Sequence, residues 1–184
     1  MRIGVPREIK PLEGRVGLIP AACSELVSAG HRVYVESGAG AQSGYSDEAY
    51  RAAGAQIAAN AAELYERGEL IVKVKEPLEG DLRYLRSDHV LFSYLHLAAN
   101  AALTRNLCSI GLTALAFETV QLASGELPLL APMSDIAGRL SVHLGTHLLH
   151  QPQGGKGLLL GGLAGAERGR VTVIGGGTAG GNAA

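Results

Sequence analysis

Short runs of hydrophobic residues alternate along this chain with longer segments of helical periodicity. The runs that predict strands are Ile3–Val5, Arg32–Glu36, Ala55–Ile57, Leu70–Lys75, Val90–Leu95, Leu112–Phe117 and Val171–Ile174. The periodic segments predict helices over Pro20–Ala29, Leu103–Ser109 and Ser134–His150. Two shorter helices are also expected, with Ser46 and Asn60 as their N-caps and with their ends near Gly54 and Gly68.

This alternation predicts an α/β fold with a mostly parallel sheet. Leu70-Ile71-Val72 is apolar at consecutive positions, as expected of a strand that helices cover on both faces. We expect a Rossmann-like domain with flanking helices over residues 1–130. Residues 131–184 would form a linking helix and the truncated start of a second Rossmann domain. Gln151–Gly169 has the composition of a linker, although Leu158–Leu160 could pack or form an edge strand.

Composition and charge exclude several classes of protein. The 184 residues are 47% hydrophobic, and 16 basic against 17 acidic side chains give a net charge of −1. A polyanion binder normally carries a positive excess, so we expect no nucleic-acid partner. The longest apolar stretch, Gly157–Ala166, is about half of a membrane-spanning helix, and no signal peptide begins the chain, so we expect no membrane segment.

The cysteines indicate a reducing compartment. Cys23 and Cys108 cannot form a disulfide framework, and a cytoplasmic location is therefore expected. Cys23 lies on a predicted amphipathic helix, where a small core residue is favoured over a nucleophile.

Ionisable side chains follow four of the predicted strands. Arg15 lies in the loop after the first strand, Lys75 ends the fourth, and His96 and Glu118 follow the next two. Ligands in open α/β sheets bind beyond the carboxyl ends of strands, although loops are also polar for other reasons. Arginine offers a fork that matches a carboxylate, lysine a point charge, and histidine a proton carrier near neutral pH. The set predicts a site for a small carboxylic or keto acid that undergoes proton transfer.

Two further groups leave alternatives open. Lys73 shares a strand face with Lys75 and could be the ligand group instead, but pairing with a carboxylate or snorkelling to solvent is favoured. His143, His147 and His150 lie at i, i+4 and i+7 on one helix face, a spacing that zinc or nickel could use. Because no nearby cysteine or carboxylate completes a ligand set, a surface, packing or interface role is favoured and no metal is expected.

A glycine-rich turn, RVTVIGGGTAGG, forms the second candidate site. Gly175, Gly177 and Gly180 fit G-x-G-x-x-G directly after a predicted strand, which is the context of dinucleotide binding. The glycines permit a tight turn, close approach to a pyrophosphate and close helix–strand packing, and a structural turn without a ligand is the alternative. Only four residues follow Gly180, so the acidic residue expected about twenty positions later is absent. We expect the opening of a dinucleotide site and no more.

The chain carries, in this order, MRIGVPREIKPLEGRVGLIP, HRVYVESGAG, KVKEP, YLHLA, AFETVQL, LPLLAPMSDIAGR, GGKGLLLGG and VTVIGGGTAGGNAA. With these segments it resembles the bacterial alanine dehydrogenases from Met1 to Ala184. Proton-translocating transhydrogenase alpha chains are similar in the first and last segments, and KVKEP, YLHLA and FETVQL favour the dehydrogenase branch. The resemblance implies NAD-dependent oxidative deamination of L-alanine to pyruvate and ammonia. It also implies that residues 1–130 form the substrate domain and that residues 131–184 form a linking helix and the beginning of the NAD-binding domain. The alternative is an NAD(H)-binding protein like the transhydrogenase alpha subunit.

The resemblance also implies roles for single residues. Arg15 matches the arginine that grips the substrate carboxylate, Lys75 the lysine that polarises the carbonyl, and His96 the acid–base histidine. The implied cofactor-binding residues are Ser134, Gly175, Gly177, Thr178 and Gly180, with Met133 lining the same pocket.

The chain departs from the family pattern at a few points. Gly14 and Gly17 stand where asparagine and alanine are usual, and glycine would widen the conformational range of the Arg15 loop. The family's catalytic aspartate lies on a later loop without a counterpart here. We therefore expect the 184-residue chain to be truncated and inactive on its own, with a non-enzymatic remnant or a partner-binding chain as a further alternative. Family members are usually hexamers, so we expect a homo-oligomer at full length.

Overall fold

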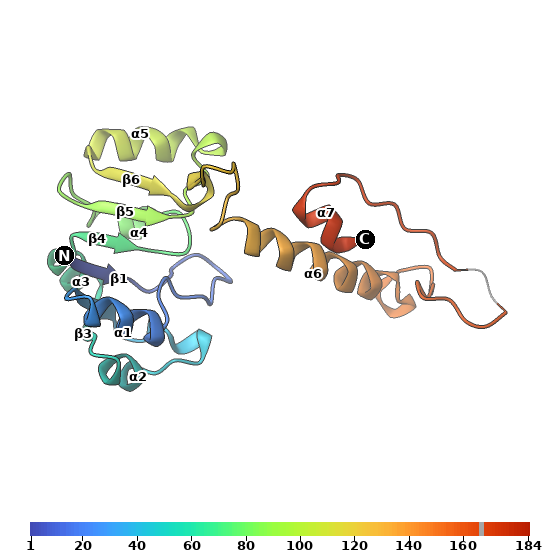
Figure 1. Ribbon diagram of the computed structural model, residues 1–184, viewed down its shortest axis with the longest axis horizontal. Coiled ribbons are helices and arrows are strands. Elements are labelled where there is room, and N and C mark those ends of the chain that lie inside the picture. The colour runs from blue at the N-terminus through green and yellow to red at the C-terminus, as the bar shows by residue number, and fades with distance from the viewer. Residues whose placement is uncertain (166–167) are drawn as a thin grey trace. The chain divides into compact units, whose positions relative to one another are not determined.

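The structure, a computed structural model, describes residues 1–165 and 168–184 and divides into two compact units (Figure 1). Unit 1 is Met1–Val120 and unit 2 is Gln121–Ala184. The division falls before the boundary predicted after residue 130. The roles of the two parts as substrate and cofactor domains stay predictions.

Unit 1 is built on a single parallel sheet. Its strands are β1 (Arg2–Val5), β2 (Arg32–Glu36), β3 (Gln56–Ala58), β4 (Leu70–Val72), β5 (Val90–Ser93) and β6 (Thr113–Ala116). They are ordered β3-β2-β1-β4-β5-β6, and every neighbouring pair is parallel, which confirms the predicted α/β class. The strand order reverses between β1 and β4, because the chain builds outward from β1 to β3 and then returns to build outward from β4 to β6.

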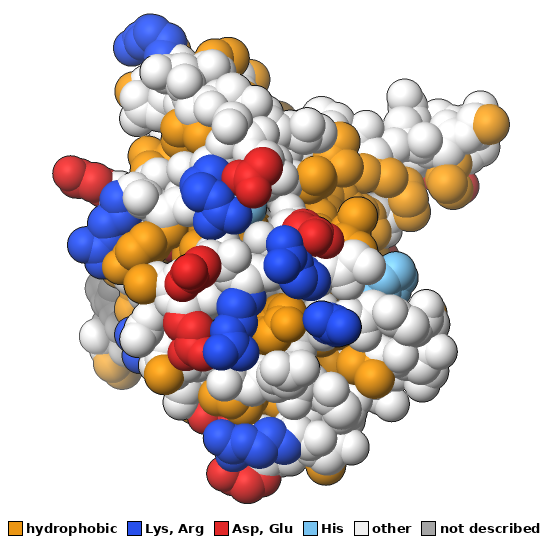
Figure 2. All heavy atoms as spheres, turned by 90° about the vertical axis from the view of Figure 1, so that its left-hand side faces the viewer, with side chains coloured by type: hydrophobic (Ala, Val, Ile, Leu, Met, Phe, Trp, Pro, Cys, Tyr) orange, Lys and Arg blue, Asp and Glu red, His pale blue; other side chains and the backbone are white. Residues whose placement is uncertain are grey.

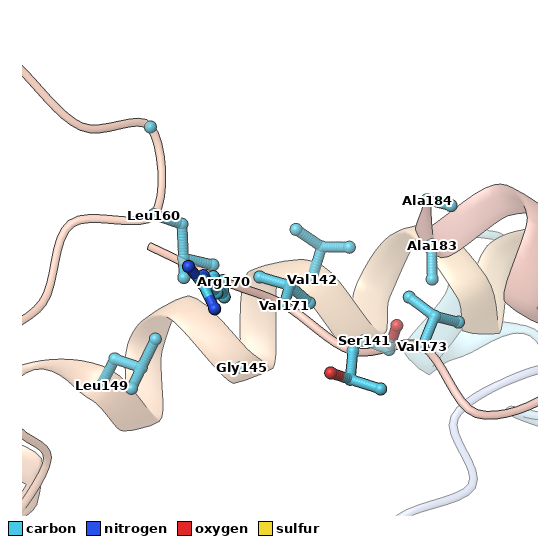
Figure 3. A pocket seen from close by; sticks show the side chains of 12 residues that line it. Ser141, Val142, Gly145, Leu149, Leu160, Arg170, Val171, Val173, Ala183 and Ala184 are labelled. Carbon is cyan, nitrogen blue, oxygen red and sulfur yellow. The ribbon is translucent and has the colours of Figure 1, made fainter. Parts of the chain in front are cut away.

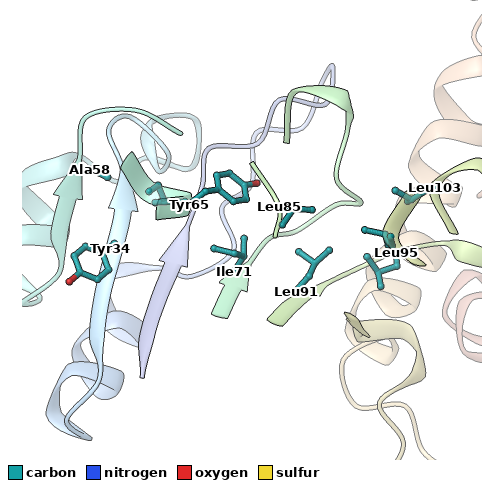
Figure 4. Packing of buried hydrophobic residues seen from close by; sticks show 10 residues of the cluster. Tyr34, Ala58, Tyr65, Ile71, Leu85, Leu91, Leu95 and Leu103 are labelled. Atoms are coloured by element: carbon teal, nitrogen blue, oxygen red, sulfur yellow. The ribbon is translucent and has the colours of Figure 1, made fainter. Parts of the chain in front are cut away.

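Alternating strand residues supply two hydrophobic cores, one on each face of the sheet. Ile3 and Val5, two residues apart on β1, face one core, as the two-residue period of a strand requires. Ile71 and Leu91 face the other core, which is shown in Figure 4. The first core is covered by α1 (Pro20–Ser28) and α2 (Asp47–Ala52), and the second by α3 (Ala61–Arg67) and α5 (Ala101–Ile110). The short helix α4 (Glu79–Leu82) adjoins the second core through Leu82.

The helix ends lie where polar caps and glycines predict them. Ser46 Oγ accepts a hydrogen bond from the Ala49 N–H (3.3 Å), and Asn60 Oδ1 accepts one from the Glu63 N–H (3.0 Å). Beyond α2, Gly54 has a φ of 84°, a region in which glycine is favoured. These caps confirm the two predicted N-termini.

Cys23 is fully buried on α1, as expected of a small core residue. Burial raises the pKa of its thiol to about 11. The thiolate that a nucleophile requires is therefore scarce at neutral pH.

The strands β4 and β5 end earlier than predicted, because side-chain carboxylates replace the neighbouring strand as acceptors of the next backbone hydrogen bond. The Val74 N–H donates to Glu8 Oε1 (2.7 Å), and the Leu95 N–H donates to Glu118 Oε1 (3.1 Å). The predicted strand Val171–Ile174 is wrong for this structure. It pairs with no strand in the described part of the chain, and a strand is defined by such pairing.

Unit 2 contains the helices α6 (Ala131–Leu149) and α7 (Thr178–Ala183), which pack against each other. They approach closely at Gly138, where a Cβ would lie 2.3 Å from the Ala179 carbonyl oxygen. The helix α6 begins before the predicted Ser134, with Pro132 in its first turn. Leu158 and Leu159, expected either to pack or to form an edge strand, are more than half exposed and lie outside any strand.

Charged side chains of both signs are interspersed on the face shown in Figure 2. Exposed ion pairs of unit 1 include Arg2–Glu69 (3.0 Å) and Arg86–Asp88 (2.9 Å). Such pairs contribute little to stability, so the fold depends mainly on its two cores. Among the described residues, no helix is both long and apolar enough to cross a membrane.

The substitution Leu91→Ala tests this dependence on the core. Leu91 is fully buried on β5, and its truncation should lower the free energy of unfolding of unit 1 by about 2–5 kcal/mol. All six tyrosines lie in unit 1, so tyrosine fluorescence during urea denaturation reports this unit alone. Leu12→Ala, at a fully exposed position, should change the free energy of unfolding of unit 1 by less than about 0.5 kcal/mol. Equal effects of the two substitutions would contradict the assigned core.

Candidate active site

The reversal of strand order brings the candidate residues to one edge of the sheet. Arg15 follows β1 and Lys75 follows β4, the two neighbouring strands between which the order reverses. His96 follows β5, which is the next strand along. In open parallel sheets, ligands bind beyond the carboxyl ends of the strands at such a point of reversal.

Lys75 and His96 are in direct contact. Lys75 Nζ lies 3.0 Å from His96 Nε2. A lysine ammonium has only donors, so Nε2 must accept this hydrogen bond and the ring proton must lie on Nδ1. The contact thus pairs a cation with the acceptor nitrogen of a neutral imidazole, and a substrate oxygen that approaches Lys75 would lie close to both groups.

Arg15 is held by a carboxylate two residues earlier in the chain. Its Nε and Nη2 donate to the two oxygens of Glu13 at 2.8 and 2.6 Å. The Glu13 side chain is 9% exposed and that of Arg15 is 51% exposed, so the carboxylate is fixed while part of the guanidinium remains accessible. The Nη1 donors are not used in this pair and are suited to a second carboxylate.

The charges of this edge act on one another. The hydrogen bonds from Arg15 hold the pKa of Glu13 below its usual value, against the effect of burial, and the Lys75 charge adds to the lowering. Burial, followed by the charge of Glu118, raises the pKa of Tyr94, whereas Arg15 lowers it. Electrostatic interactions therefore connect the Arg15 loop both to Lys75 and to the segment that carries His96.

His96 has a backbone conformation that is rare for its residue type. Its φ of 51° and ψ of 36° are left-handed, a conformation that costs on the order of 1–3 kcal/mol for a residue other than glycine. Glu118 Oε1 accepts hydrogen bonds from the N–H groups of His96 (2.7 Å) and Leu95 (3.1 Å). The Tyr94 ring stacks on the imidazole, with the centroids 6.2 Å apart and the planes at 18°. These contacts hold the turn at the end of β5.

The two glycines of the Arg15 loop are constrained by their neighbours. A Cβ at Gly17 would lie 2.7 Å from the Val72 carbonyl oxygen, so glycine allows the loop to lie directly against β4. The Gly14 carbonyl accepts a hydrogen bond from Ser43 Oγ (2.8 Å). The loop is thus held at both positions where a wider conformational range was expected.

Lys73 lies in a buried ionic cluster and not at the exposed edge. Its side chain is 1% exposed, and Nζ lies 3.4 Å from both Glu8 Oε2 and Asp81 Oδ1. The Tyr65 hydroxyl donates to the same Asp81 oxygen (2.9 Å). Burial raises the pKa of Glu8, although the charge of Lys73 opposes the shift. The structure confirms the favoured interpretation that Lys73 pairs with a carboxylate.

Unit 2 contains a cavity that is lined by two of the implied cofactor-binding residues. Ser134 on α6 and Thr178 on α7 both line this cavity of about 470 Å³, and Met133 does not. Gly175 has a φ of 104°, and a Cβ at Gly180 would lie 1.8 Å from the Gly175 carbonyl oxygen. The turn therefore closes tightly only with glycine at these positions.

A larger cavity of about 910 Å³ lies along α6 and is mainly apolar (Figure 3). Val142, Leu149 and Val171 line it, and Arg170 is the only charged residue among the described residues of its lining. None of the predicted site residues borders it. On the same helix, the rings of His147 and His150 lie 6.0 Å apart, but no group of three ligating residues that could hold a metal occurs among the described residues.

Family models match almost the whole chain. The model described as "Alanine dehydrogenase/PNT, N-terminal domain" matches residues 4–137, and the model described as "Alanine dehydrogenase/PNT, C-terminal domain" matches residues 141–184. The chain belongs to the alanine dehydrogenase/PNT family. This family membership was expected from the sequence segments around Arg15, Lys75 and His96.

Curated relatives agree with this assignment. The alanine dehydrogenases of Geobacillus stearothermophilus and Methanococcus maripaludis are 52% and 51% identical over 184 residues, which is 100% of this chain and 50% and 49% of theirs. The chain thus spans about half the length of the curated relatives it matches. A solved L-alanine dehydrogenase is similar with a TM-score of 0.92 and 51% identity, over 100% of this chain and 50% of that one.

A transhydrogenase from Sinorhizobium meliloti is a more distant structural relative. It matches with a TM-score of 0.72 and 27% identity, over 80% of this chain and 44% of its own. Within the alanine dehydrogenase/PNT family, the chain is therefore more similar to the dehydrogenases than to this transhydrogenase.

Sequence reasoning missed the residues that hold the site. Glu118 was noted only as a charged residue after a strand, and Glu13 and Tyr94 were not singled out. The position of Glu13 two residues before Arg15 is a local signal that could have indicated the pair. The contact between Glu118 and the His96 backbone joins the ends of two strands and has no such signal.

The Glu13–Arg15 pair predicts a pH dependence. Because the folded-state pKa of Glu13 lies below 4.5, the pair should stabilise the fold above this pH and be lost as the pH falls through the lower, folded-state pKa. Carboxyl-carbon NMR should give a Glu13 titration midpoint below 4.5, and Arg15→Gln should raise this midpoint. Arg51→Gln, which removes an exposed arginine paired with Glu48, should leave it unchanged. A wild-type midpoint at or above 4.5 would show that the pair does not form in solution.

Proposed function

We propose that this chain carries the substrate-binding part of an NAD-dependent alanine dehydrogenase, which converts L-alanine to pyruvate and ammonium. The contact between Lys75 Nζ and His96 Nε2 carries the proposal. It lies at the sheet edge where the strand order reverses, which is also the edge that Arg15 follows. A cation that can polarise a carbonyl beside a base that can accept a proton is the pair that amination of a 2-oxo acid requires.

Each of the three residues takes one role. The free donors of Arg15 bind the pyruvate carboxylate, and Lys75 donates to the 2-oxo oxygen. As ammonia adds to the carbonyl carbon, the oxygen gains a proton, and the resulting carbinolamine loses this oxygen as water. In the amination direction, His96 Nε2 donates the proton that is needed when the carbinolamine loses water. In the direction of alanine oxidation, the same nitrogen accepts a proton from the attacking water. Binding by two residues far apart in sequence also orients the substrate, which is a large part of such catalysis.

The residues of unit 2 fit a nicotinamide dinucleotide. Ser134 and Thr178 line one cavity, and Gly177 has open space where a Cβ would point, which allows close approach of a ligand to the backbone. Gly175 and Gly180 close the turn. NAD, when bound, would supply the acceptor for the hydride from the substrate Cα. A homo-oligomer, a hexamer as is usual in the family, and a cytoplasmic location are proposed on the family resemblance alone.

Binding of pyruvate to the 184-residue chain tests the substrate site. Pyruvate should shift the NMR signals of Arg15, Lys75 and His96, because these residues bind it. Arg15→Gln should weaken binding about tenfold or more, since a hydrogen bond to a charged group contributes about 1.5–3 kcal/mol. Arg51→Gln, on the exposed surface of α2, serves as the control and should leave the affinity unchanged. Equal affinity of the wild type and Arg15→Gln would refute the assigned role of Arg15.

The activity is tested with the whole product of the gene. NADH oxidation should require pyruvate and ammonium together, because both are consumed in the reverse reaction. Lys75→Gln should reduce kcat/KM for pyruvate by about a hundredfold or more, since it removes the charge that polarises the carbonyl. Oxidation of NADH without either co-substrate but with a second nicotinamide nucleotide as acceptor would favour the transhydrogenase alternative.

A further inference from the structure

We propose that Glu118 is a positioning residue, whose carboxylate holds the His96 backbone in the left-handed conformation that directs the imidazole to Lys75. The catalytic consequence of this role rests on the function proposed above. The structural role does not, because it concerns the conformation of the chain alone.

The carboxylate of Glu118 binds two successive N–H groups at the end of β5. Oε1 accepts from His96 (2.7 Å) and from Leu95 (3.1 Å), and Oε2 lies 3.3 Å from the Leu95 nitrogen. A carboxylate bound to two backbone donors forms charge-assisted hydrogen bonds, which are stronger than those between neutral groups. One side chain therefore fixes the direction of the backbone on both sides of the Leu95–His96 peptide bond.

The other contacts of His96 are local or depend on the direction of its side chain. The residue is exposed, so burial does not trap its side chain. Its side chain forms the hydrogen bond with Lys75 and stacks with Tyr94, and both contacts depend on where the backbone directs the imidazole. The only other residue besides glycine with a positive φ in the described chain is the exposed Leu12. On the backbone of His96, the carbonyl accepts a hydrogen bond from the Ala99 N–H (3.1 Å) within the turn that follows, and the N–H donates to Glu118 (2.7 Å). Glu118 thus supplies the contact that reaches this backbone from outside its own turn.

The contact is not an ordinary local helix cap. The 3-10 turn that begins after His96 spans only Leu97–Ala99, and its cap position makes no side-chain hydrogen bond of its own. Glu118 lies 22 residues away, in the 3-10 turn Phe117–Thr119 that follows β6. The carboxylate therefore links the segment after β6 to the segment after β5, at the edge of the sheet where the candidate site lies. A residue that only capped a helix would not need to link two strands.

The 184-residue chain with Glu118→Ala or Glu118→Gln tests this role. In the wild type, nitrogen NMR should place the His96 ring proton on Nδ1, and the three-bond coupling of its amide should indicate a positive φ. Glu118→Ala should abolish both signatures and accelerate exchange of the His96 amide about tenfold or more. Glu118→Gln retains an oxygen acceptor and should preserve both signatures.

Glu63→Ala is the matched control, because Glu63 Oε2 also accepts a backbone N–H, that of Ala59 (2.7 Å), and the residue lies on α3. It should leave the His96 signals unchanged, although it removes the same type of contact. Unchanged His96 signatures in Glu118→Ala would overturn the proposal, and so would their equal loss in Glu63→Ala.

Kinetics of the whole gene product test the catalytic consequence. Glu118→Ala should reduce kcat about tenfold to a hundredfold with KM for pyruvate changed less than about threefold, because proton transfer is affected and carboxylate binding is not. Glu118→Gln should restore most of kcat. Loss of activity in both variants, with normal His96 signatures in Glu118→Gln, would overturn positioning as the catalytic role. A wild type that shows the His96 signatures but neither binds pyruvate nor aminates it would refute the proposed function and leave the structural role standing.

Discussion

The reversal of strand order between β1 and β4 is the constraint on which the candidate site depends. In a parallel sheet all strands end at the same edge, so the loops after neighbouring strands must lie close to each other. Pairing of Ile3 with Leu70 and of Gly4 with Ile71 therefore places the Arg15 loop beside the segment that carries Lys75. The glycine at Gly4 assists this pairing, because a Cβ there would lie 3.1 Å from Ile71 Cδ1.

Local features of the fold could be predicted from the sequence, and features that depend on distant partners could not. The strand Arg32–Glu36 and the caps at Ser46 and Asn60 lie where the sequence places them, because side-chain type and short-range hydrogen bonds determine them. Strand order is not contained in any local pattern. The length of β4 also depends on a distant group, the Glu8 carboxylate, which binds the Val74 N–H. The apolar segment Val171–Ile174 forms no strand, because a strand requires a second strand with which to pair.

The same distinction applies to the site. Arg15, Lys75 and His96 could be singled out because each follows a predicted strand and matches a family segment. That Lys75 meets His96 at 3.0 Å requires the pairing of β4 with β5, which aligns Leu70 with Val90. Sequence patterns identify the residues with functional groups, whereas the groups that hold them, such as Glu118, become visible only when the strand ends are placed together.

The carboxylates of this edge share a property that bears on which substrates it accepts. Glu13 is bound to Arg15, Glu76 to Lys10, and Glu118 to two backbone N–H groups, so each anion already has a partner of its own. In the proposed function, a substrate carboxylate would therefore meet the remaining donors of Arg15 and the ammonium of Lys75, with less repulsion from neighbouring anions. Because Glu13 and Glu118 also fix the conformations of their partners, the binding groups are oriented before the substrate arrives, which reduces the entropy lost on binding. Under the proposed function, the anions of the site would thus act through the groups they hold, and the cations and the imidazole would act on the substrate.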